Sequence, residues 1–320
     1  MRRRGFLIGL GATGLGAMGL SACDTTATPY DRAKAESAFP PIGKLIGVNG
    51  LNIHATDQGA GDGPPVILIH GASGNVRDWH FGIIDKLTTG RRVIAMDRPG
   101  FGYSDRAADP DAWHPSEQAK QLRRAARRMD ARKPILVGHS WGAAVALAWA
   151  LDAPDEVSGV VSVSGATMAW GGLAGALSSV GVGDFAVDYY VSSLSRRADS
   201  GAIDDFLARG FSPQPVPKGY ADYVGAPLAL REHTLIANGD DLKNTQAALQ
   251  DMASRYGELS VPLQIMHGEE DRLLKIEQHG YPLERATNRS DITPLPGVGH
   301  MAHHARPDVL LRLIEKIEAG

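Results

Sequence analysis

Several features that would define a protein's class are scarce in this chain of 320 residues. It has a single cysteine, Cys23, so no disulfide can form within the chain. Its net charge is only −3, which indicates no electrostatic attraction to nucleic acid. The apolar stretch at residues 5–20 is shorter than the roughly 20 residues that span a bilayer. The remaining composition, 43% hydrophobic and 22% charged, is near the globular average and suits one large α/β domain with an insertion.

The beginning of the sequence has the pattern of an export signal. Residues 2–4 are arginines, residues 5–20 are apolar and rich in glycine, and small residues follow. This order predicts a secretory signal peptide over residues 1–22. The pair Arg3 and Arg4 resembles a twin-arginine signal, although the usual serine or threonine before the pair is absent, so the export route stays open.

Residues 20–23, LSAC, resemble the bacterial lipobox. The resemblance implies cleavage before Cys23 and lipidation of its sulfur. We therefore expect a lipoprotein exported from the bacterial cytoplasm and anchored in a membrane, on the periplasmic side or at the cell surface. The small, polar, proline-containing residues that follow predict a flexible tether over residues 23–43.

The pentapeptide GHSWG at residues 138–142 carries the strongest chemical signal. It follows the apolar run at residues 135–137, a predicted strand, and precedes an alanine-rich predicted helix at residues 143–150. A serine between two glycines at such a junction matches the nucleophile elbow G-x-S-x-G. The turn is so sharp that the serine backbone is strained and side chains at the flanking positions would clash. Ser140 is therefore the predicted nucleophile.

A serine hydroxyl needs a base within hydrogen-bond reach, and the base needs an acid to orient it. A predicted strand at residues 261–266 runs into a polar turn that holds three acidic side chains. We predict Asp271 as the acid, because of its spacing after Gly268, over its neighbours Glu269 and Glu270.

His300 is the predicted base. It follows the run at residues 291–295 and a glycine-rich loop, from which it could reach the serine. His303 and His304 follow closely, and three histidines so near one another raise the alternative of a metal site. Zinc needs three or four converging ligands, and the single cysteine and the lack of a nearby acidic partner argue against it. We predict no metal and no cofactor, and a supporting or surface position for His303 and His304.

A tetrahedral intermediate also needs two donors directed at its oxyanion. The amide of Trp141 is one, because it lies at the start of a predicted helix. The second is expected in the loop HGASG at residues 70–74, which follows the predicted strand at residues 66–69. We predict the amide of Ala72 as that donor.

Together these residues resemble the α/β-hydrolase superfamily over roughly residues 48–318. The segment DRPGFGYSD at residues 97–105 resembles the loop of a branch that holds epoxide hydrolases, haloalkane dehalogenases, cofactor-free haloperoxidases, meta-cleavage C–C hydrolases and many esterases. In that branch, epoxide hydrolases and dehalogenases have an aspartate at the elbow, where this chain has Ser140. The difference favours acyl transfer.

The expected fold is an α/β-hydrolase fold: a mostly parallel eight-stranded sheet with helices on both faces and an inserted helical cap. The core is predicted over residues 44–164 and 258–320, and the cap over residues 165–257. Aromatic and thioether side chains of the cap are candidates to line the pocket: Met168, Trp170, Phe185, Tyr189, Tyr190, Phe206, Phe211 and Tyr223.

Local patterns predict further elements. A hairpin is expected over residues 45–57, turning at Asn49 and Gly50, with helices around residues 79–87 and 116–129.

The predicted function is a serine hydrolase that cleaves a small to medium carboxylic ester through an acyl-enzyme. Ser140 would attack, His300 would move the proton, Asp271 would hold the imidazole, and the amides of Trp141 and Ala72 would hold the oxyanion. The alternatives are a C–C bond hydrolase or a lactonase with the same triad, or a non-catalytic lipid-anchored binding protein. The expected partners are a small ester-like molecule and, through the lipid, a membrane.

Overall fold

The computed structural model describes residues 31–169 and 200–320. The predicted signal peptide and Cys23 lie outside the described residues, as do the candidate pocket residues Trp170, Phe185, Tyr189 and Tyr190. Within the described residues, every helix is too short or too polar to cross a membrane.

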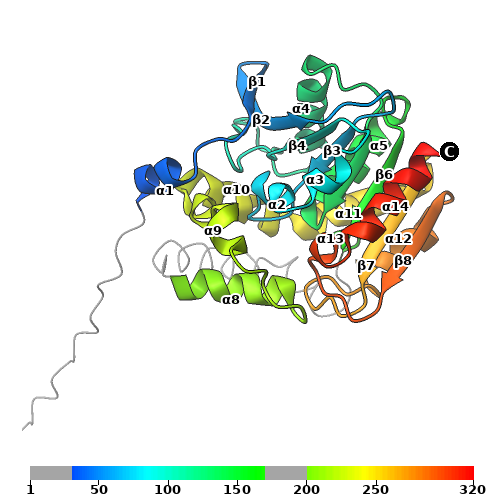
Figure 1. Ribbon diagram of the computed structural model, residues 1–320. Coiled ribbons are helices and arrows are strands. Elements are labelled where there is room, and N and C mark those ends of the chain that lie inside the picture. Colours follow the sequence, from blue (N-terminus) through cyan, green and yellow to red (C-terminus); the bar gives the residue numbers. More distant parts are fainter. Residues whose placement is uncertain (1–30, 170–199) are drawn as a thin grey trace, which may run out of the picture.

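An eight-stranded sheet forms the centre of the fold, with the strand order β1-β2-β4-β3-β5-β6-β7-β8 (Figure 1). The pairs β1–β2 and β2–β4 are antiparallel, and all later neighbours are parallel. This is the predicted α/β-hydrolase sheet, and the fold class is confirmed. The strands are β1 (Lys44–Val48), β2 (Leu51–Gln58), β3 (Val66–Ile69), β4 (Val93–Met96), β5 (Ile135–His139), β6 (Gly159–Val163), β7 (Leu263–Gly268) and β8 (Ser290–Leu295).

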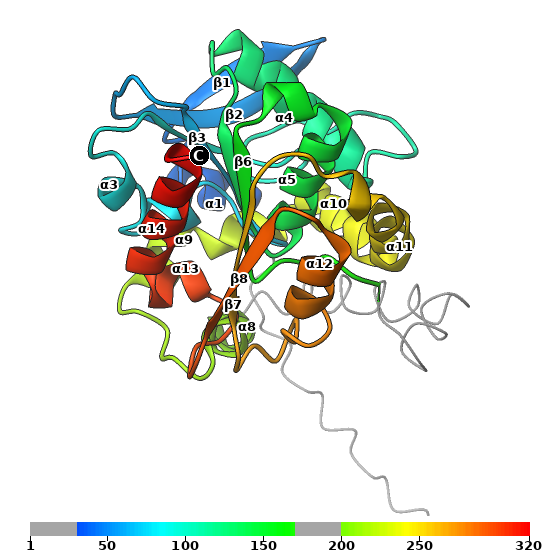
Figure 2. The same cartoon turned by 90° about the vertical axis from the view of Figure 1, so that its right-hand side faces the viewer.

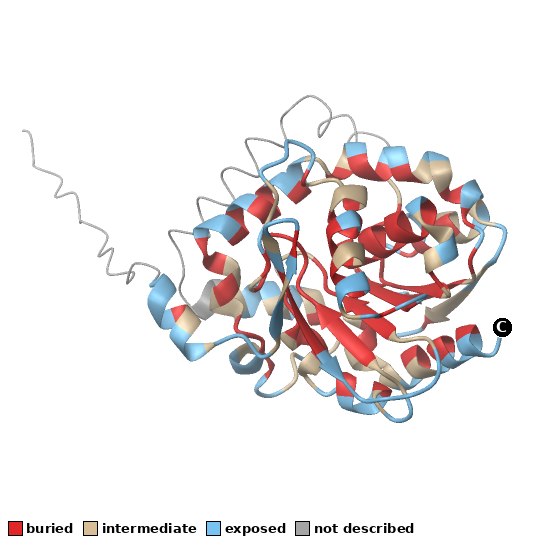
Figure 3. Cartoon of the chain, turned by 90° about the horizontal axis from the view of Figure 1, so that it is seen from above, coloured by how far each residue is buried: buried red, intermediate tan, exposed pale blue. Residues whose placement is uncertain are grey.

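Helices cover both faces of the sheet (Figure 2). In β3, Val66 and Leu68 point into one core, whereas Ile67 and Ile69 point into the other, because successive strand residues face opposite sides. Burial on both sides explains why the inner strands are continuously apolar. Figure 3 shows the same arrangement, with buried sheet and inward helix faces and an exposed outer surface. The face that includes Val66 and Leu68 is covered by α2 (Arg77–His80), α3 (Ile84–Leu87), α13 (Ala302–Ala305) and α14 (Pro307–Glu318). The face that includes Ile67 and Ile69 is covered by α4 (Pro115–Arg128), α5 (Trp141–Asp152), α11 (Thr245–Arg255) and α12 (Gly280–Ala286).

Two local predictions had different outcomes. The hairpin turns at Asn49 and Gly50, whose φ angles are +51° and +82°, as a tight two-residue turn requires. The single helix expected over residues 79–87 is wrong. Gly82, with φ of +78°, ends α2 and separates it from α3, because a residue in the left-handed region cannot continue an α-helix.

The described chain between β6 and β7 is largely helical. It contains α8 (Ser200–Phe211), α9 (Tyr220–Val224), the 3-10 turn Ala226–Leu230, α10 (Glu232–Lys243) and α11, and ends in the 3-10 turn Tyr256–Glu258. The α11 residues Leu249 and Met252 belong to the same core as α5. The last helix of the predicted cap therefore covers the sheet itself.

The tether expected over residues 23–43 is wrong in its second half. Residues Arg32–Ala38 form helix α1, whose first turn is capped by the Asp31 side chain accepting from the Lys34 amide at 3.0 Å. The Glu36 carboxylate pairs with the buried guanidinium of Arg231 at 3.2 Å. This segment is therefore docked on the domain, beside α10 in Figure 1.

A buried ion pair joins α10 to the strand-end loops. The Arg98 guanidinium donates to Asp241 at 2.7 Å, and both side chains are almost fully buried. Arg98 also donates to the carbonyl oxygens of His70 and Gly71, at 3.1 and 3.2 Å. Since Arg98 lies in the DRPGFGYSD segment, that motif connects the loop after β3 with α10.

We predict that Asp241→Asn lowers the free energy of unfolding by about 3 kcal/mol, because it leaves the Arg98 charge buried without a counter-ion. The matched control is Asp57→Asn, which ends the more exposed pair between Asp57 and Arg92 and should cost less than about 1 kcal/mol. Urea denaturation followed by circular dichroism measures both. Equal losses in the two variants would contradict the role given to the buried pair.

Candidate active site

The backbone at Ser140 makes the sharp turn that the sequence predicts. Ser140 has φ of +54° and ψ of −120°, and α5 begins at the next residue. Its amide donates to the Val163 carbonyl, and its carbonyl accepts from the amides of Ala143 and Ala166, each at 3.0 Å. These hydrogen bonds hold a strained conformation that a serine would otherwise avoid.

Neighbouring backbone leaves no space for side chains on either flank of Ser140. A Cβ at Gly138 would lie 2.3 Å from the Gly142 carbonyl oxygen, and one at Gly142 would lie 2.3 Å from the Ile69 carbonyl oxygen. Both separations are far below van der Waals contact. Gly138 is therefore required by the close approach of the first turn of α5, and Gly142 by the packing of that turn against the end of β3.

His300 and Asp271 form a buried pair at the ends of the last two strands. The distance from His300 Nδ1 to Asp271 Oδ2 is 2.7 Å. Asp271 Oδ1 accepts from the backbone amides of Leu273 and Leu274, both at 2.9 Å. The carboxylate is thus fixed from both sides and directed at the imidazole.

Electrostatics also favour an ionised Asp271. Burial alone would raise the pKa of Asp271, but hydrogen bonds from the His267 and His300 imidazoles outweigh it and hold that pKa well below its usual range. Glu269 and Glu270, by contrast, are exposed. Of the three acidic candidates, Asp271 is the one that forms a hydrogen bond with His300.

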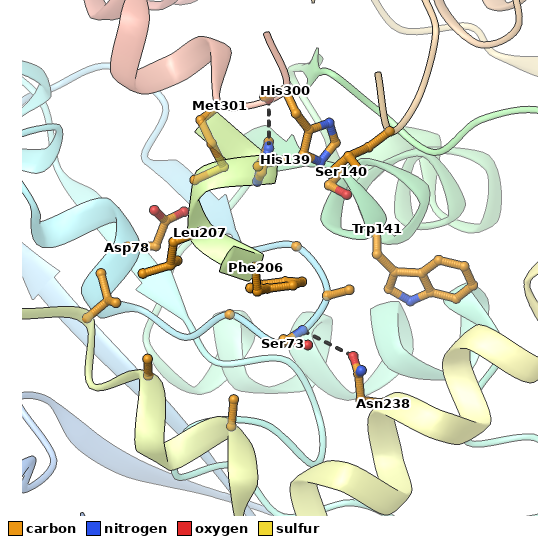
Figure 4. A pocket seen from close by; sticks show the side chains of 18 of the residues that line it. Ser73, Asp78, His139, Ser140, Trp141, Phe206, Leu207, Asn238, His300 and Met301 are labelled. Atoms are coloured by element: carbon orange, nitrogen blue, oxygen red, sulfur yellow. Dashed lines mark hydrogen bonds between the residues drawn. The ribbon is translucent and has the colours of Figure 1, made fainter. Parts of the chain in front are cut away.

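Ser140 and His300 lie in the wall of the same cavity, together with Ala72 and Trp141. Figure 4 shows the Ser140 hydroxyl and the His300 ring next to each other at its upper edge. Because Nδ1 of His300 is hydrogen-bonded to Asp271, Nε2 is the ring nitrogen left to face the cavity. All five residues of the predicted site therefore converge on one end of the sheet.

The loop after β3 passes close to the serine. A Cβ at Gly71 would lie 3.0 Å from the Ser140 Cβ, so Gly71 permits the approach. Trp141 is the first residue of α5, where backbone amides have no partner within the helix. The amide of Ser73 donates to Asn238 Oδ1 at 3.1 Å, so α10 also supports this loop.

Buried polar groups fix the same loop from below. His70 Nδ1 donates to the Gly71 carbonyl at 2.8 Å, and His70 Nε2 accepts from the Arg98 amide at 2.9 Å. Burial, with the nearby Arg98 charge, lowers the pKa of His70 to about 4, so the ring is neutral near pH 7. Sequence reasoning missed Asn238 and the part that Arg98 plays in the loop.

The cavity has a volume of about 300 Å³ and is mainly apolar. Phe206 and Phe211 line it, as the sequence suggested, whereas Met168 and Tyr223 are not among its lining residues. None of the described lining residues is a lysine or an arginine. Its apolar lining includes Ile203, Phe206, Leu207, Phe211, Val224, Leu230, Leu235, Leu242, Leu273, Leu274 and Met301.

His303 and His304 are not surface residues. His303 is fully buried, and the Nε2 atoms of His303 and His304 lie 3.1 and 2.7 Å from the two carboxylate oxygens of Asp78. Tyr220 donates to the same carboxylate at 2.6 Å. His139 donates from Nε2 to the His300 carbonyl at 3.2 Å. This cluster could not be predicted from local patterns, because Asp78 lies far from the histidines along the chain.

A family model described as alpha/beta hydrolase fold matches residues 64–307. The chain belongs to the α/β-hydrolase fold family. This membership confirms the predicted superfamily and the prediction of a hydrolase-type enzyme.

Curated relatives match this α/β hydrolase over a shorter stretch. Epoxide hydrolase 3 of Siraitia grosvenorii is 32% identical over 119 residues, which is 37% of each chain. The 2-hydroxymuconate semialdehyde hydrolase of Pseudomonas sp. (strain CF600) is 35% identical over 133 residues, 40% of this chain and 44% of that protein. The match thus spans well under half the length of these relatives.

Solved structures resemble the α/β hydrolase over most of their length. An esterase from Exiguobacterium antarcticum has a TM-score of 0.68 and 18% identity, covering 86% of this chain and 99% of that one. The enol-lactonase from Burkholderia xenovorans LB400 has a TM-score of 0.69 and 17% identity, covering 87% and 100%. At this level of identity, the likeness concerns the fold.

Proposed function

We propose that this α/β hydrolase cleaves a small to medium, uncharged carboxylic ester through an acyl-enzyme. The observation that carries the proposal is that His300 lines an apolar cavity together with Ser140, while its Nδ1 lies 2.7 Å from Oδ2 of the buried Asp271. A serine on a strained turn beside an oriented imidazole is the arrangement that acyl transfer needs.

In the proposed reaction, the Ser140 hydroxyl attacks the ester carbonyl carbon while His300 Nε2 takes its proton. Asp271 stabilises the imidazolium that forms and keeps the ring oriented. The amides of Ala72 and Trp141 donate to the oxyanion of the tetrahedral intermediate. His300 then protonates the leaving alcohol, and the acyl group stays on Ser140. Water, activated by the same imidazole, releases the carboxylic acid and restores the hydroxyl.

The cavity supports the choice of substrate. Its volume of about 300 Å³ is at the small end of ligand sites. Apolar side chains such as Leu207, Phe211 and Met301 would bury a hydrocarbon acyl chain. A carboxylate-bearing substrate would lose its hydration without gaining a cation from the described lining residues.

A neutral lactone is the second candidate substrate, supported by the same apolar cavity. A lactone presents an uncharged ester carbonyl to Ser140 and needs no cationic partner in the cavity. The C–C hydrolase alternative is less well supported if its substrate carries a carboxylate, because no cation among the described lining residues would pair with that charge.

If Ser140 is the nucleophile and Asp271 orients the base, substitution of either residue should sharply lower kcat. Ser140→Ala should lower kcat for p-nitrophenyl butyrate at least about a thousandfold with an unchanged melting temperature, because only the nucleophile is removed. Asp271→Asn should be comparably severe, because the amide favours the wrong imidazole tautomer. The controls are Ser254→Ala and Glu270→Gln, both close to wild type. Substantial activity in Ser140→Ala, or a damaging Glu270→Gln, would contradict the assignment, and fluorophosphonate labelling of Ser140 separates a catalyst from a non-catalytic binding protein.

Substrate preference should follow the cavity. We expect the highest kcat/KM among p-nitrophenyl butyrate and hexanoate, lower values for acetate and palmitate, and poor hydrolysis of a succinate half-ester, whose free carboxylate would be desolvated. A matched γ-lactone series run in parallel tests the second candidate. Preference for the anionic half-ester would overturn the argument from the apolar lining.

We also propose the lipid anchor at Cys23, which rests on the LSAC sequence alone. Expression in a bacterium with labelled palmitate should give a labelled protein in the membrane fraction. The Cys23→Ser variant should lose the label, because the chain has no other thiol. Equal labelling of both forms would contradict the anchor.

A further inference from the structure

Three side chains that the proposed ester hydrolysis does not use meet beside the cavity that Ser140 lines. Asp78 comes from α2, His139 from the end of β5, and His303 from α13. All three are buried, and one possible ligand atom from each lies within 4.8 Å of the others. Among residues 31–169 and 200–320, no other group of three such side chains meets in this way.

The three ligand atoms lie near one another, and their spread of up to 4.8 Å is wider than in a formed zinc site. His303 Nε2 lies 3.1 Å from Asp78 Oδ2, and the ring centres of His139 and His303 are 4.4 Å apart. Ligand atoms around a tetrahedral zinc ion are about 3.4 Å apart, since the zinc–nitrogen distance is about 2.0–2.1 Å. To hold an ion, these side chains would have to shift so that coordination replaces the direct hydrogen bond between His303 and Asp78.

His303 also has unsatisfied bonding capacity. Its side chain is fully buried, and its Nδ1 atom has no hydrogen-bond partner. A buried polar atom without a partner is costly and calls for an explanation, such as a ligand that is bound in use. Nε2 of the same ring contacts Asp78, so an ion would bind His303 through one of these two nitrogens.

The surroundings would complete such a site. Asp78 and His139 both line the cavity, so an ion could enter from there and keep one position open towards it. His304 and Tyr220 contact Oδ1 of Asp78, at 2.7 and 2.6 Å, and would orient the carboxylate, as outer partners of metal ligands commonly do.

We propose that Asp78, His139 and His303 bind a divalent transition-metal ion such as Zn²⁺, with a remaining coordination position open to the cavity. Two imidazoles and one carboxylate are a ligand set that zinc accepts in open sites. The acid that the sequence lacked near His303 is thus supplied by α2. The proposed ligands do not include Ser140, His300 or Asp271, although His139 donates to the His300 backbone carbonyl.

The test is equilibrium dialysis and calorimetry of the full chain with Zn²⁺, and visible absorption spectra with Co²⁺. The wild type should bind one equivalent with micromolar or tighter affinity, and Co²⁺ should give the strong bands of low-coordinate nitrogen and oxygen ligation. Asp78→Asn and His303→Gln should each weaken binding at least about a hundredfold, because each removes a ligand.

Matched controls separate this site from other sources of binding. His233→Gln removes an exposed histidine, Cys23→Ser removes the thiol, and Ser140→Ala abolishes the proposed chemistry, yet all three should bind Zn²⁺ as the wild type does. Circular dichroism checks that each variant folds. If the ligand variants fail to fold, the wild-type stoichiometry and Co²⁺ spectrum decide. A wild type without stoichiometric binding, or equal binding by folded ligand variants, would overturn the proposal.

Discussion

The backbone of Ser140 is the constraint on which the site depends. A non-glycine residue with positive φ costs on the order of 1–3 kcal/mol and persists only where its surroundings enforce it. Here the surroundings are the hydrogen bonds to Val163, Ala143 and Ala166 and the close packing of Gly138 and Gly142. Each of these contacts comes from the sheet or from α5. The exposed hydroxyl is therefore a consequence of how the central strands pack.

That packing also explains why much of the site could be predicted. In parallel strands the carboxyl ends meet at one edge, so residues that directly follow β3, β5, β7 and β8 must lie near one another. Ala72, Ser140, Asp271 and His300 all follow such ends, and the sequence marks them by glycine and polar residues after apolar runs. Local signals and strand order together were enough to predict that these residues lie at one end of the sheet.

The interactions that the sequence did not predict join segments with no shared local signal. Asp241 meets Arg98 from α10, and Asp78 meets His303 from α2, in both cases across more than a hundred residues. Nothing in the spacing of these residues shows that they pair, because the pairing arises only when the helices dock. Helix α1 is similar: its composition is that of a linker, and it is held by contacts such as Glu36 with Arg231.

Two buried carboxylates in this fold show why position decides chemistry. Burial tends to raise the pKa of Asp78 and of Asp271, yet neighbouring histidines hold both pKa values well below their usual range. The imidazole on Asp271 shares a cavity wall with Ser140, so a proton it accepts can come from a nucleophile and go to a leaving group. The oxygens of Asp78 are shared among two histidines and Tyr220, with no serine in the group. Imidazole and carboxylate groups that meet without a nucleophile are suited to binding a metal ion. In our two proposals, histidine and aspartate thus serve acyl transfer where they face Ser140 and metal binding where they meet without a nucleophile.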